Sequence, residues 1–454
     1  MRVILVSLGS MGDTFPFIFM GRALADRGHE VFLLGNEDYQ PHVHDDRINY
    51  VPIISPERYY REREIPRRGT DQIAEAIDFF HWCCEQIEPV YRFIQERYES
   101  GETVVCAQSY AMGARVAQIR DQVPLATVHV QPFWMRSSFD MPPLPTWLTR
   151  LAGPSLQSLI DLVIDHTFGR DIKRFCQAQG VYPTKRMMRT WWNSPELILG
   201  LWPEWYSPPQ RDWPIQTVLT GFPISTEMDG RFASLELDEF LAAGEPPIVF
   251  SRGSNDRRAD QFIQTSIEIA RNLRRRALFV SPTSSLGRKD FPDGMKAFPY
   301  VPFDVVLSRA AAHVHHGGIG TIAMSLRAGV PQLTVPSVFD QPDNSERLRR
   351  LGVSDLIKPT SWNVKRGTAR LEKLINSVQV RTKCAEYRSR IEEHQTWPMV
   401  IDAIERLATD HGSLTSNRTT LLVHRHSPSG PPTPASAAPD SKALRMRGSI
   451  RREE

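Results

Sequence analysis

The most concentrated group of chemically capable residues is a glycine-rich turn that follows two histidines. Residues 314–321 read Val-His-His-Gly-Gly-Ile-Gly-Thr and stand between a predicted strand and a predicted helix. Glycines allow a ligand to approach the backbone closely, and the start of a helix offers free N–H groups and a positive dipole end. With an imidazole beside it, from His316 or His315, the turn is suited to a diphosphate. The alternative is a tight strand-to-helix connection with two surface histidines.

A carboxylate and a carboxamide form a second group after the next predicted strand. The segment 329–332 leads into a strand that ends at Pro336, and Asp340 and Gln341 follow shortly after. In α/β domains, ligands bind at the carboxyl ends of the strands. This pair is suited to binding several hydroxyl groups of a sugar. The alternative is that Asp340 only caps the helix that follows.

A third group lies near the N-terminus, after the apolar run 3–6. It consists of Gly9, Ser10, Gly12 and Asp13. A hydroxyl is a poor nucleophile, and a positioned carboxylate can take its proton as it attacks. A carboxylate such as that of Asp13, placed after a strand, is the residue type that this proton transfer requires. The alternative is that Asp13 caps the following helix, and the two roles can coexist.

Two lone histidines, His81 and His129, are spare candidates for the same proton transfer. A histidine near the apolar end of a strand is more often structural. The chain contains no Asp-x-Asp sequence and no Cys-x-x-Cys pair among its five cysteines. These observations favour chemistry without a metal, and they argue against a disulfide framework.

The elements that must position these groups alternate between strand and helix in both halves of the chain. Strands are predicted at 3–6, 31–34, 50–54, 103–107, 125–130, 248–250, 277–280, 312–314 and 332–335. Helices are predicted at 15–27, 71–98, 109–121, 155–177, 259–275, 305–310, 319–328 and 341–350. Such alternation implies parallel sheets covered on both faces. We therefore expect an α/β protein with two Rossmann-like, doubly wound parallel-sheet domains that face a cleft.

Charge and composition exclude several classes of protein. The net charge is +3, and residues 412–454 hold seven basic and three acidic residues, so the rest of the chain is nearly neutral. A neutral body offers no electrostatic footprint for nucleic acid. The basic tail is either solvated or in peripheral contact with an anionic membrane. No apolar run approaches the ~18 residues of a membrane span, and we expect a cytoplasmic protein.

The spacing of these motifs resembles the donor-binding signature of the family 1 glycosyltransferases, which have the GT-B fold. That signature has a histidine before a glycine-rich helix start, then Gly-Val-Pro, then an acid-glutamine pair. The resemblance covers nearly all of residues 1–408. Within the family, the chain looks closest to the bacterial branch that contains the rhamnosyltransferase of rhamnolipid synthesis, with glycopeptide and sterol glycosyltransferases nearby. The opening Gly-Ser-x-Gly-Asp-x-x-Pro-Phe and the segment 213–223 carry that closer resemblance.

The resemblance implies a role for each matching residue. His316 would contact the donor diphosphate, Asp340 and Gln341 would hold sugar hydroxyls, and Asp13 would be the base. The remaining donor residues are the N–H groups of the turn, a phosphate-binding serine, and an aromatic segment that packs on the base: Gly318, Gly320, Thr321, Ser254, Tyr300 and Val301. His315 is a less certain member, because many relatives have another residue there.

Two departures from the family pattern bear on the donor. The glutamine after the Tyr-Val-Pro segment is Phe303 here, and the glutamate that plant relatives use on the ribose falls at Met324. A missing acceptor for ribose hydroxyls favours a deoxythymidine diphosphate sugar over a UDP-sugar.

The resemblance also implies the domain organisation. We expect an acceptor-binding domain at 1–220, a linker at 221–247 and a nucleotide-sugar-binding domain at 248–390. A helix at 391–410 would cross back toward the first domain, and 411–454 would be a disordered tail. We expect the cleft to close when substrates bind.

These features predict an inverting, metal-independent hexosyltransferase without a cofactor. It would move a hexose or deoxyhexose from a UDP- or dTDP-sugar, which is a co-substrate, to a hydroxyl of a hydrophobic acceptor. Aromatic residues between 133 and 213 either line that acceptor pocket or form ordinary core. The alternatives are a sterol or natural-product glucosyltransferase that uses UDP-glucose, a sugar-nucleotide epimerase of the same fold, and a non-catalytic donor-binding partner of another transferase.

Overall fold

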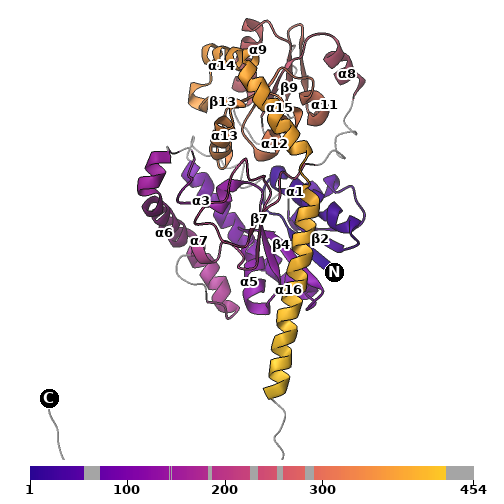
Figure 1. Ribbon diagram of the computed structural model, residues 1–454, viewed down its shortest axis with the longest axis vertical. Helices are drawn as coiled ribbons and strands as arrows, with labels where there is room; N and C mark the ends of the chain where they lie inside the picture. The colour runs from indigo at the N-terminus through magenta and orange to yellow at the C-terminus, as the bar shows by residue number, and fades with distance from the viewer. Residues whose placement is uncertain are drawn as a thin grey trace, which may run out of the picture. The chain divides into compact units, whose positions relative to one another are not determined.

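The computed structural model describes residues 1–55, 72–142, 144, 146–182, 187–224, 234–252, 259–281 and 291–425. Residues 1–411 form one compact unit that holds both sheets, and residues 412–454 form a separate unit. The two predicted parallel sheets are confirmed (Figure 1).

The first sheet has seven parallel strands in the order β3-β2-β1-β4-β5-β6-β7. Its strands are β1 (Arg2–Val6), β2 (Glu30–Asn36), β3 (Ile48–Ile54), β4 (Thr103–Gln108), β5 (Leu125–His129), β6 (Leu197–Gly200) and β7 (Thr217–Leu219). The inner strand β1 pairs with β2 on one side and β4 on the other. Its run Val3 to Val6 is fully buried, as expected for a strand covered on both faces.

The helices of the first half connect and flank these strands. They are α1 (Met11–Asp26), α3 (Gln72–Glu85), α4 (Ile87–Arg97), α5 (Met112–Asp121), α6 (Thr146–Ala178) and α7 (Met187–Thr190), with short 3-10 turns at Glu37–His42 and Pro132–Met135. The single helix predicted at 71–98 is two helices that meet at Gln86. The helix predicted at 155–177 begins nine residues earlier, and Pro154 lies inside it.

The second sheet has six parallel strands in the order β10-β9-β8-β11-β12-β13. Its strands are β8 (Ile248–Ser251), β9 (Ala277–Val280), β10 (Met295–Phe298), β11 (Ala312–His315), β12 (Gln332–Thr334) and β13 (Ser354–Leu356). Its helices are α8 (Leu235–Ala242), α9 (Ala259–Asn272), α11 (Phe303–Leu307), α12 (Ile319–Ala328), α13 (Gln341–Arg350), α14 (Val364–Asn376) and α15 (Val378–Glu392), with a 3-10 turn at Pro359–Ser361. The helix α8 lies inside the segment predicted as a linker.

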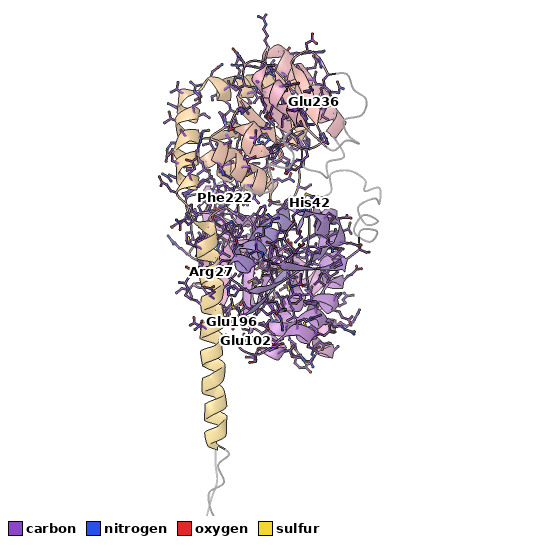
Figure 2. The ribbon with its side chains drawn as sticks, turned by 90° about the vertical axis from the view of Figure 1, so that its right-hand side faces the viewer. Arg27, His42, Glu102, Glu196, Phe222 and Glu236 are labelled. Carbon is purple, nitrogen blue, oxygen red and sulfur yellow. The ribbon has the colours of Figure 1, made fainter. Side chains whose placement is uncertain are left out.

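The last helix, α16 (Thr396–Arg425), continues beyond the predicted start of the tail at 411. Its part up to His411 packs on the first half. Arg27 donates to Asp402 (2.7 Å) and to Glu405 (3.2 Å), while His411 Nδ1 lies 2.7 Å from Glu196. Arg27 and Glu196 are both seen beside this helix in Figure 2. The rest of the predicted tail, from residue 426, lies outside the described residues.

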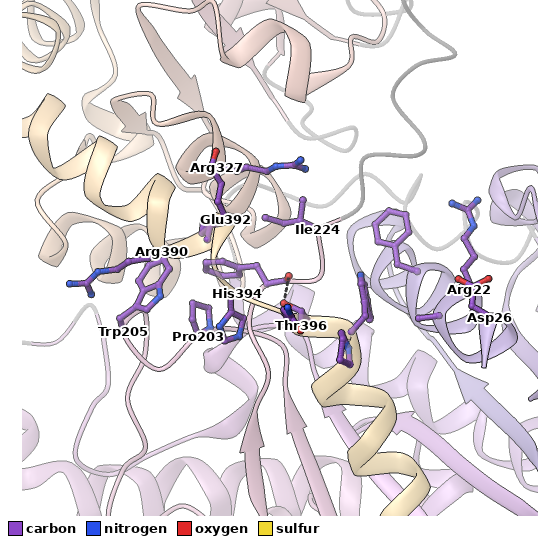
Figure 3. Close-up of a pocket in the computed structure, with 17 residues that line it drawn as sticks. Arg22, Asp26, Pro203, Trp205, Ile224, Arg327, Arg390, Glu392, His394 and Thr396 are labelled. Atoms are coloured by element: carbon purple, nitrogen blue, oxygen red, sulfur yellow. Dashed lines mark hydrogen bonds between the residues drawn. The ribbon is translucent and has the colours of Figure 1, made fainter. Parts of the chain in front are cut away.

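The chain crosses between the halves twice, after β7 and again between α15 and α16. Hydrogen bonds join the two crossing segments. His394 Nε2 lies 2.9 Å from the Thr220 carbonyl oxygen, and the Thr396 hydroxyl donates to the Phe222 carbonyl oxygen (3.0 Å). A cavity of about 510 Å³ lies against this double crossing, with Trp205, Arg327 and Trp397 among its lining residues (Figure 3).

Among the described side chains of α6, five large aliphatic ones are exposed. They are Leu151 (78%), Leu159 (58%), Ile160 (37%), Leu162 (65%) and Val163 (57%). In the part of the chain that the structure describes, no helix combines the length and apolar character needed to cross a bilayer. Contact with a membrane surface stays a prediction.

Candidate functional site

The candidate residues gather at the two places where strand order reverses. In the first sheet, the order turns at β1 and β4, and the loop with Asp13 follows β1. In the second sheet it turns at β8 and β11, and the histidine-glycine turn follows β11. Such switch points at the carboxyl ends of strands are where open α/β sheets bind ligands.

The histidine-glycine turn leaves the start of α12 open. Gly318 occupies the N-cap position and offers no side chain to the first N–H groups of the helix. Nothing lies within 4 Å of the place where a Cβ at Gly320 would stand. A Cβ at Gly318 would lie 2.5 Å from His316 Nε2, so only glycine lets the imidazole rest against the turn. The geometry suits an anion at this helix start.

His316 is neutral in this arrangement. Burial of the imidazole, and then the charge of Arg252, lower the pKa of His316 to about 4. Its Nδ1 is buried and has no hydrogen-bond partner among the described residues. The side chain can therefore donate a hydrogen bond near neutral pH, but it supplies no positive charge of its own before an anion binds.

Arg252 places a positive charge near His316, which is itself neutral. It follows β8, and its Nη2 donates to the Ser337 hydroxyl (3.0 Å), which lies beyond β12. Because β11 lies between β8 and β12, this side chain spans the edge where the histidine-glycine turn begins. The pattern Ser-Arg-Gly-Ser at 251–254 contained the signal, but only the strand order shows which turn the arginine approaches. Ser254, the predicted phosphate ligand in that pattern, lies outside the described residues.

His315 points into the sheet and is not a surface residue. It is fully buried, its Nε2 lies 2.9 Å from Gln332 Oε1, and its Nδ1 accepts from the Gly317 N–H (3.1 Å). Burial, and then the charge of His316, lower the pKa of His315 to about 3. Both nitrogens are engaged, so this residue shapes the turn, and the geometry does not favour its direct contact with a donor.

Asp340 and Gln341 begin α13 beside the same turn. Asp340 occupies the N-cap position, but its side chain makes no capping hydrogen bond. The Gln341 Oε1 accepts from the Ser337 N–H (2.9 Å), which fixes the bend that leads into the helix. Helix capping therefore does not account for the Asp340 carboxylate.

Asn344 links the two donor motifs, a role that the sequence analysis missed. Its Nδ2 donates to Asp340 Oδ2 (2.5 Å) and to the Gly317 carbonyl oxygen (3.2 Å). The residue was visible in the sequence as the end of Asp-Gln-Pro-Asp-Asn. Its helical spacing from Asp340 predicts contact with that residue, but contact with the turn depends on the fold.

Asp13 is held in place by its own loop. The Ser10 N–H and hydroxyl both donate to Asp13 Oδ2, at 2.9 Å and 2.8 Å. Gly9 has φ +114°, and a Cβ there would lie 2.8 Å from the same oxygen. The N-cap residue of α1 is Ser10, not Asp13, but Asp13 takes part in the cap as the third residue of the helix. The other oxygen, Oδ1, faces the Tyr110 hydroxyl at 3.4 Å, so a second role remains open to the carboxylate.

Tyr110 is a second residue that the sequence analysis missed. It follows β4, the neighbour of β1, and its hydroxyl also lies 3.1 Å from the Leu8 carbonyl oxygen. Burial, and then the charge of Asp13, raise the pKa of Tyr110 well above its usual value. It therefore stays protonated and orients the Asp13 carboxylate.

The carboxylates of Asp13 and Asp340 belong to different halves and lie within electrostatic reach of each other. Burial, and then the negative charge of Asp13, raise the pKa of Asp340 to about 7. Ring contact between Phe79 and Phe339, with centroids 5.9 Å apart, also joins the halves here. The predicted base and the predicted sugar-binding acid thus belong to one site.

An aromatic cluster extends from this site into the first half. Tyr110 packs on Phe79 (5.2 Å between centroids) and on Trp134 (5.5 Å). Trp134 in turn packs on Phe133 (5.1 Å) and on Trp192 (5.8 Å). Some of the aromatic residues predicted to line an acceptor pocket therefore adjoin Asp13. Others are core, including Trp202, which is fully buried.

The remaining candidates occupy a range of settings. Tyr300 is 42% exposed and Val301 is buried. Phe303 packs its ring on His313, with centroids 5.3 Å apart. Met324 packs against the apolar cluster around Val330. Phe303 and Met324, the two departures from the family pattern, therefore both pack against neighbouring side chains.

The two spare histidines, His129 and His81, have different surroundings. His129 is buried at the end of β5, and its Nε2 lies 2.7 Å from Asn193 Oδ1. Burial lowers the pKa of His129 to about 4. His81 lies on the exposed side of α3. Among the described residues, no group of three or more His, Cys, Asp or Glu side chains is arranged to hold a metal ion.

Comparison with known proteins identifies the family. Residues 280–404 match the family profile described as erythromycin biosynthesis protein CIII-like, C-terminal domain. The chain is 30% identical over 377 residues to O-mycaminosyltylonolide 6-deoxyallosyltransferase of Streptomyces fradiae, covering 78% of this chain and 85% of that protein. The chain belongs to the family 1 glycosyltransferases. This glycosyltransferase is also 27% identical over 371 residues to vancomycin aglycone glucosyltransferase of Amycolatopsis orientalis, covering 78% of this chain and 85% of the relative.

Solved structures agree on the fold of this glycosyltransferase. The glycotransferase of kitacinnamycin superposes with a TM-score of 0.70 at 21% identity, covering 89% of this chain and 98% of that one. Spinosyn rhamnosyltransferase SpnG, complexed with thymidine diphosphate, gives a TM-score of 0.63 at 18% identity, covering 89% of this chain and 100% of that one. The two sheets are therefore those of a GT-B enzyme.

Proposed function

We propose that this glycosyltransferase moves a deoxyhexose from a dTDP-sugar to a hydroxyl of a hydrophobic natural-product or lipid acceptor, with inversion and without a metal. The observation that carries the proposal is the meeting of Asp13 with Asp340 and the open start of α12 in one site. A base, a sugar-binding acid and an anion site are what a direct displacement requires.

Asp13 acts as the general base. Its Oδ1 takes the proton of the acceptor hydroxyl while the acceptor oxygen forms a bond to the anomeric carbon of the sugar. Ser10 and Tyr110 hold the carboxylate in orientation. A positioned base of this kind contributes about 10²–10⁴-fold to the rate.

The second half stabilises the departing nucleoside diphosphate. The bond from the anomeric carbon to the phosphate oxygen breaks, and the negative charge grows on that oxygen. The N–H groups of Gly320 and Thr321, the His316 imidazole and the Arg252 guanidinium surround the place where it would lie. Fixed donors and a helix dipole suit such a charge without a metal. Asp340 and Gln341 would hold the sugar hydroxyls.

The donor assignment rests on the ribose side of the site. Met324 offers only a thioether where plant relatives have a carboxylate. A nucleotide whose ribose lacks one hydroxyl, as in dTDP, therefore loses little binding energy at this position. The relative from Streptomyces fradiae is named as a deoxyhexose transferase. The second candidate is UDP-glucose, because the vancomycin relative is named as a glucosyltransferase, as is a sterol 3-beta-glucosyltransferase of Arabidopsis thaliana that is 23% identical. The rhamnolipid branch stays a prediction.

The acceptor assignment rests on the aromatic cluster beside Asp13. Phe133 is 36% exposed at the edge of that cluster, while Trp192 at its inner end is buried. A graded aromatic surface that ends at a base is suited to an apolar molecule with one reactive hydroxyl.

A donor panel tests the proposal. The purified protein is incubated with dTDP-rhamnose, dTDP-glucose, UDP-glucose or UDP-rhamnose, with and without hydroxylated macrolides, sterols or lipids, and nucleotide release is measured. Release that requires an acceptor and favours dTDP-sugars is expected. Clear preference for UDP-sugars would overturn the donor assignment. Release without any acceptor would point to an epimerase-like reaction instead.

A further inference from the structure

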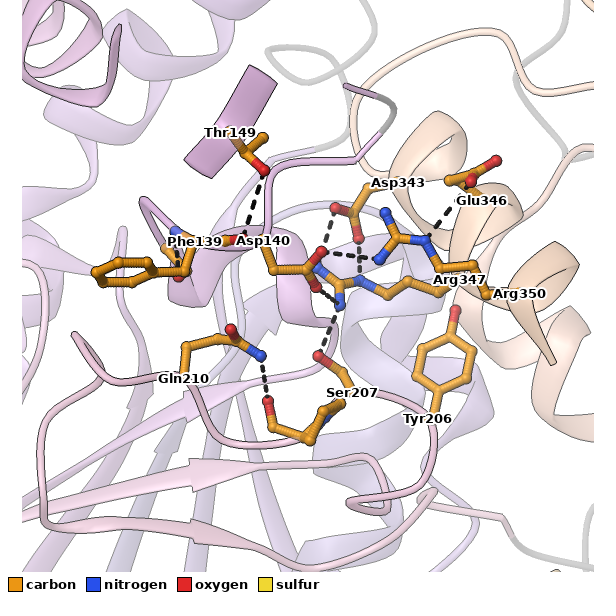
Figure 4. Close-up of polar contacts among 12 residues, drawn as sticks. Phe139, Asp140, Thr149, Tyr206, Ser207, Gln210, Asp343, Glu346, Arg347 and Arg350 are labelled. Atoms are coloured by element: carbon orange, nitrogen blue, oxygen red, sulfur yellow. Dashed lines mark hydrogen bonds and ion pairs between the residues drawn. The ribbon is translucent and has the colours of Figure 1, made fainter. Parts of the chain in front are cut away.

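One charged network joins the halves at a distance from the reacting groups. Asp140 belongs to the first half and stands before α6. Its Oδ2 accepts from Arg347 Nη1 (2.6 Å), and its Oδ1 accepts from Arg350 Nη1 (2.8 Å). Both arginines lie on α13 of the second half. Figure 4 shows the Asp140 carboxylate between them.

The guanidinium of Arg347 is buried and donates hydrogen bonds to several residues of this network. Its side chain is 5% exposed, its Nε donates to Asp343 (2.7 Å), and its Nη1 also donates to the Ser207 hydroxyl (2.8 Å). Burial alone would raise the pKa of Asp140, but the charges of Arg347 and Arg350 outweigh it and lower that pKa. Asp140 is therefore ionised near neutral pH and balances two positive charges.

The same helix carries the proposed sugar-binding groups at its other end. Asp340 is its N-cap residue, and Asn344 binds both Asp340 and the Gly317 carbonyl oxygen. The Tyr206 hydroxyl of the first half also donates to the Asn344 carbonyl oxygen (3.2 Å). The ten-residue helix α13 therefore contacts the donor site through its first turn and the first half of the chain through the turns that follow.

We propose that Asp140 is a positioning residue: through Arg347 and Arg350 it holds α13, and with it Asp340, in the arrangement that binds the donor sugar. The role of Asp340 in this proposal rests on the proposed function. Because this charged network bridges the two halves, the carboxylate also favours the closed arrangement of the halves. It must separate from α13 when substrates enter and products leave.

The matched control is Asp212, which lies in the first half close to Asp140. It accepts from the Ser137 hydroxyl (2.7 Å) and the Ser138 N–H (2.6 Å), two residues before Asp140. Asp212→Asn therefore removes a negative charge from the same region, keeps an oxygen that can accept from these serines, and leaves the Asp140 carboxylate and its contacts with α13 in place. Asp140→Asn removes the charge that faces α13 and keeps the size of the side chain.

The experiment compares Asp140→Asn, Asp140→Glu and Asp212→Asn with the unaltered protein. Donor KM should rise about tenfold in Asp140→Asn, equivalent to about 1.4 kcal/mol, while the affinity for free dTDP or UDP stays within about twofold. Asp140→Glu should recover part of the loss, and Asp212→Asn should leave donor KM unchanged. Equal effects of the two Asn variants, or equal weakening of free nucleotide and nucleotide sugar, would overturn the proposal.

A ligand-free measurement separates this proposal from the proposed function. Small-angle X-ray scattering should give a larger radius of gyration for Asp140→Asn than for Asp212→Asn, because the halves are less often closed. An unchanged radius would overturn the role of Asp140 in closure. Absence of nucleotide release from every donor in the unaltered protein would instead remove the proposed function, and the scattering comparison would still decide the role of Asp140.

Discussion

The two switch points of this glycosyltransferase have the same architecture and opposite electrostatics. After β1, the loop presents the Asp13 carboxylate, oriented by Ser10 and Tyr110 and bordered by aromatic rings. After β11, the turn presents uncapped N–H groups and a neutral imidazole, with an arginine beside them. In the proposed function, the first edge accepts a proton from a neutral molecule and the second receives an anion.

The difference shows that a strand-loop-helix unit does not determine its chemistry. In the first half, the side chain three residues after the N-cap folds back on the loop and occupies the helix start. In the second half, glycine at the N-cap leaves the helix start vacant for a ligand. In the proposed function, the half whose helix start is left uncapped is the half that binds the phosphate.

The largest effect should come from Asp13→Asn. The amide still accepts from Ser10 and so keeps the cap, but it cannot take a proton. We expect kcat to fall by about 10²–10⁴ while donor KM changes little. Steady-state kinetics with varied donor measures both values. A fall in donor affinity with kcat preserved would place Asp13 on the donor side and break the comparison.

The next largest effect should come from His316→Ala. Loss of one donor to the growing charge should lower kcat by about 10²-fold, as for removal of one oxyanion-binding group. His316→Gln, which keeps an N–H donor, should retain more activity than His316→Ala. His129→Gln serves as a control that should leave kcat unchanged. Equal loss in the Ala and Gln variants would argue against a hydrogen bond from His316.

A smaller effect should appear in the pH profile, through Asp340. Because its pKa is raised to about 7, donor kcat/KM should rise about tenfold from about pH 6 to about pH 8. Between about pH 4 and about pH 7 the folded state holds a proton on Asp340 that the unfolded state has lost, so the free energy of unfolding falls as pH rises through this range. Asp340→Asn should show neither trend. Thermal unfolding and donor kinetics at several pH values measure both, and an unchanged profile in the variant would contradict this role.

The smallest effect should come from Tyr110→Phe. The ring still packs in the aromatic cluster, but the hydroxyl near Asp13 is lost. The expected fall in kcat is about threefold to tenfold, from a contact that contributes about 0.5–1.5 kcal/mol. If acceptor KM rises while kcat is kept, the tyrosine serves the acceptor pocket and not the base.

Local signals in the sequence were sufficient to predict the two helices that begin at the donor motifs, α12 and α13. The predicted bounds of α12 and α13 agree with the structure, because Gly329 ends one helix in the left-handed region and Pro342 begins the other. The short strands β6, β7, β10 and β13 were missed, since runs of three or four residues at or near a sheet edge carry little periodicity. The domain boundaries proposed around 221–247 stay a prediction.

The contacts that complete the site could not be predicted, because they join residues far apart in the chain. Tyr110 lies 97 residues from Asp13, and Asp140 lies 207 residues from Arg347. Arg252 was present in a recognised motif, but its approach to His316 follows from the strand order alone. The sequence indicated which residue types were available, and the topology decided which of them meet.

The return of α16 to the first half has a consequence for recombining this enzyme with its relatives. Val400 and Ile404 are buried in the same apolar cluster as Leu24, and Glu405 lies 3.0 Å from His29 Nε2. A hybrid made with one crossover between 225 and 233 would pair this first half with the last helix of another parent. A hybrid with two crossovers, the second near Thr396, would keep the first half together with its own α16.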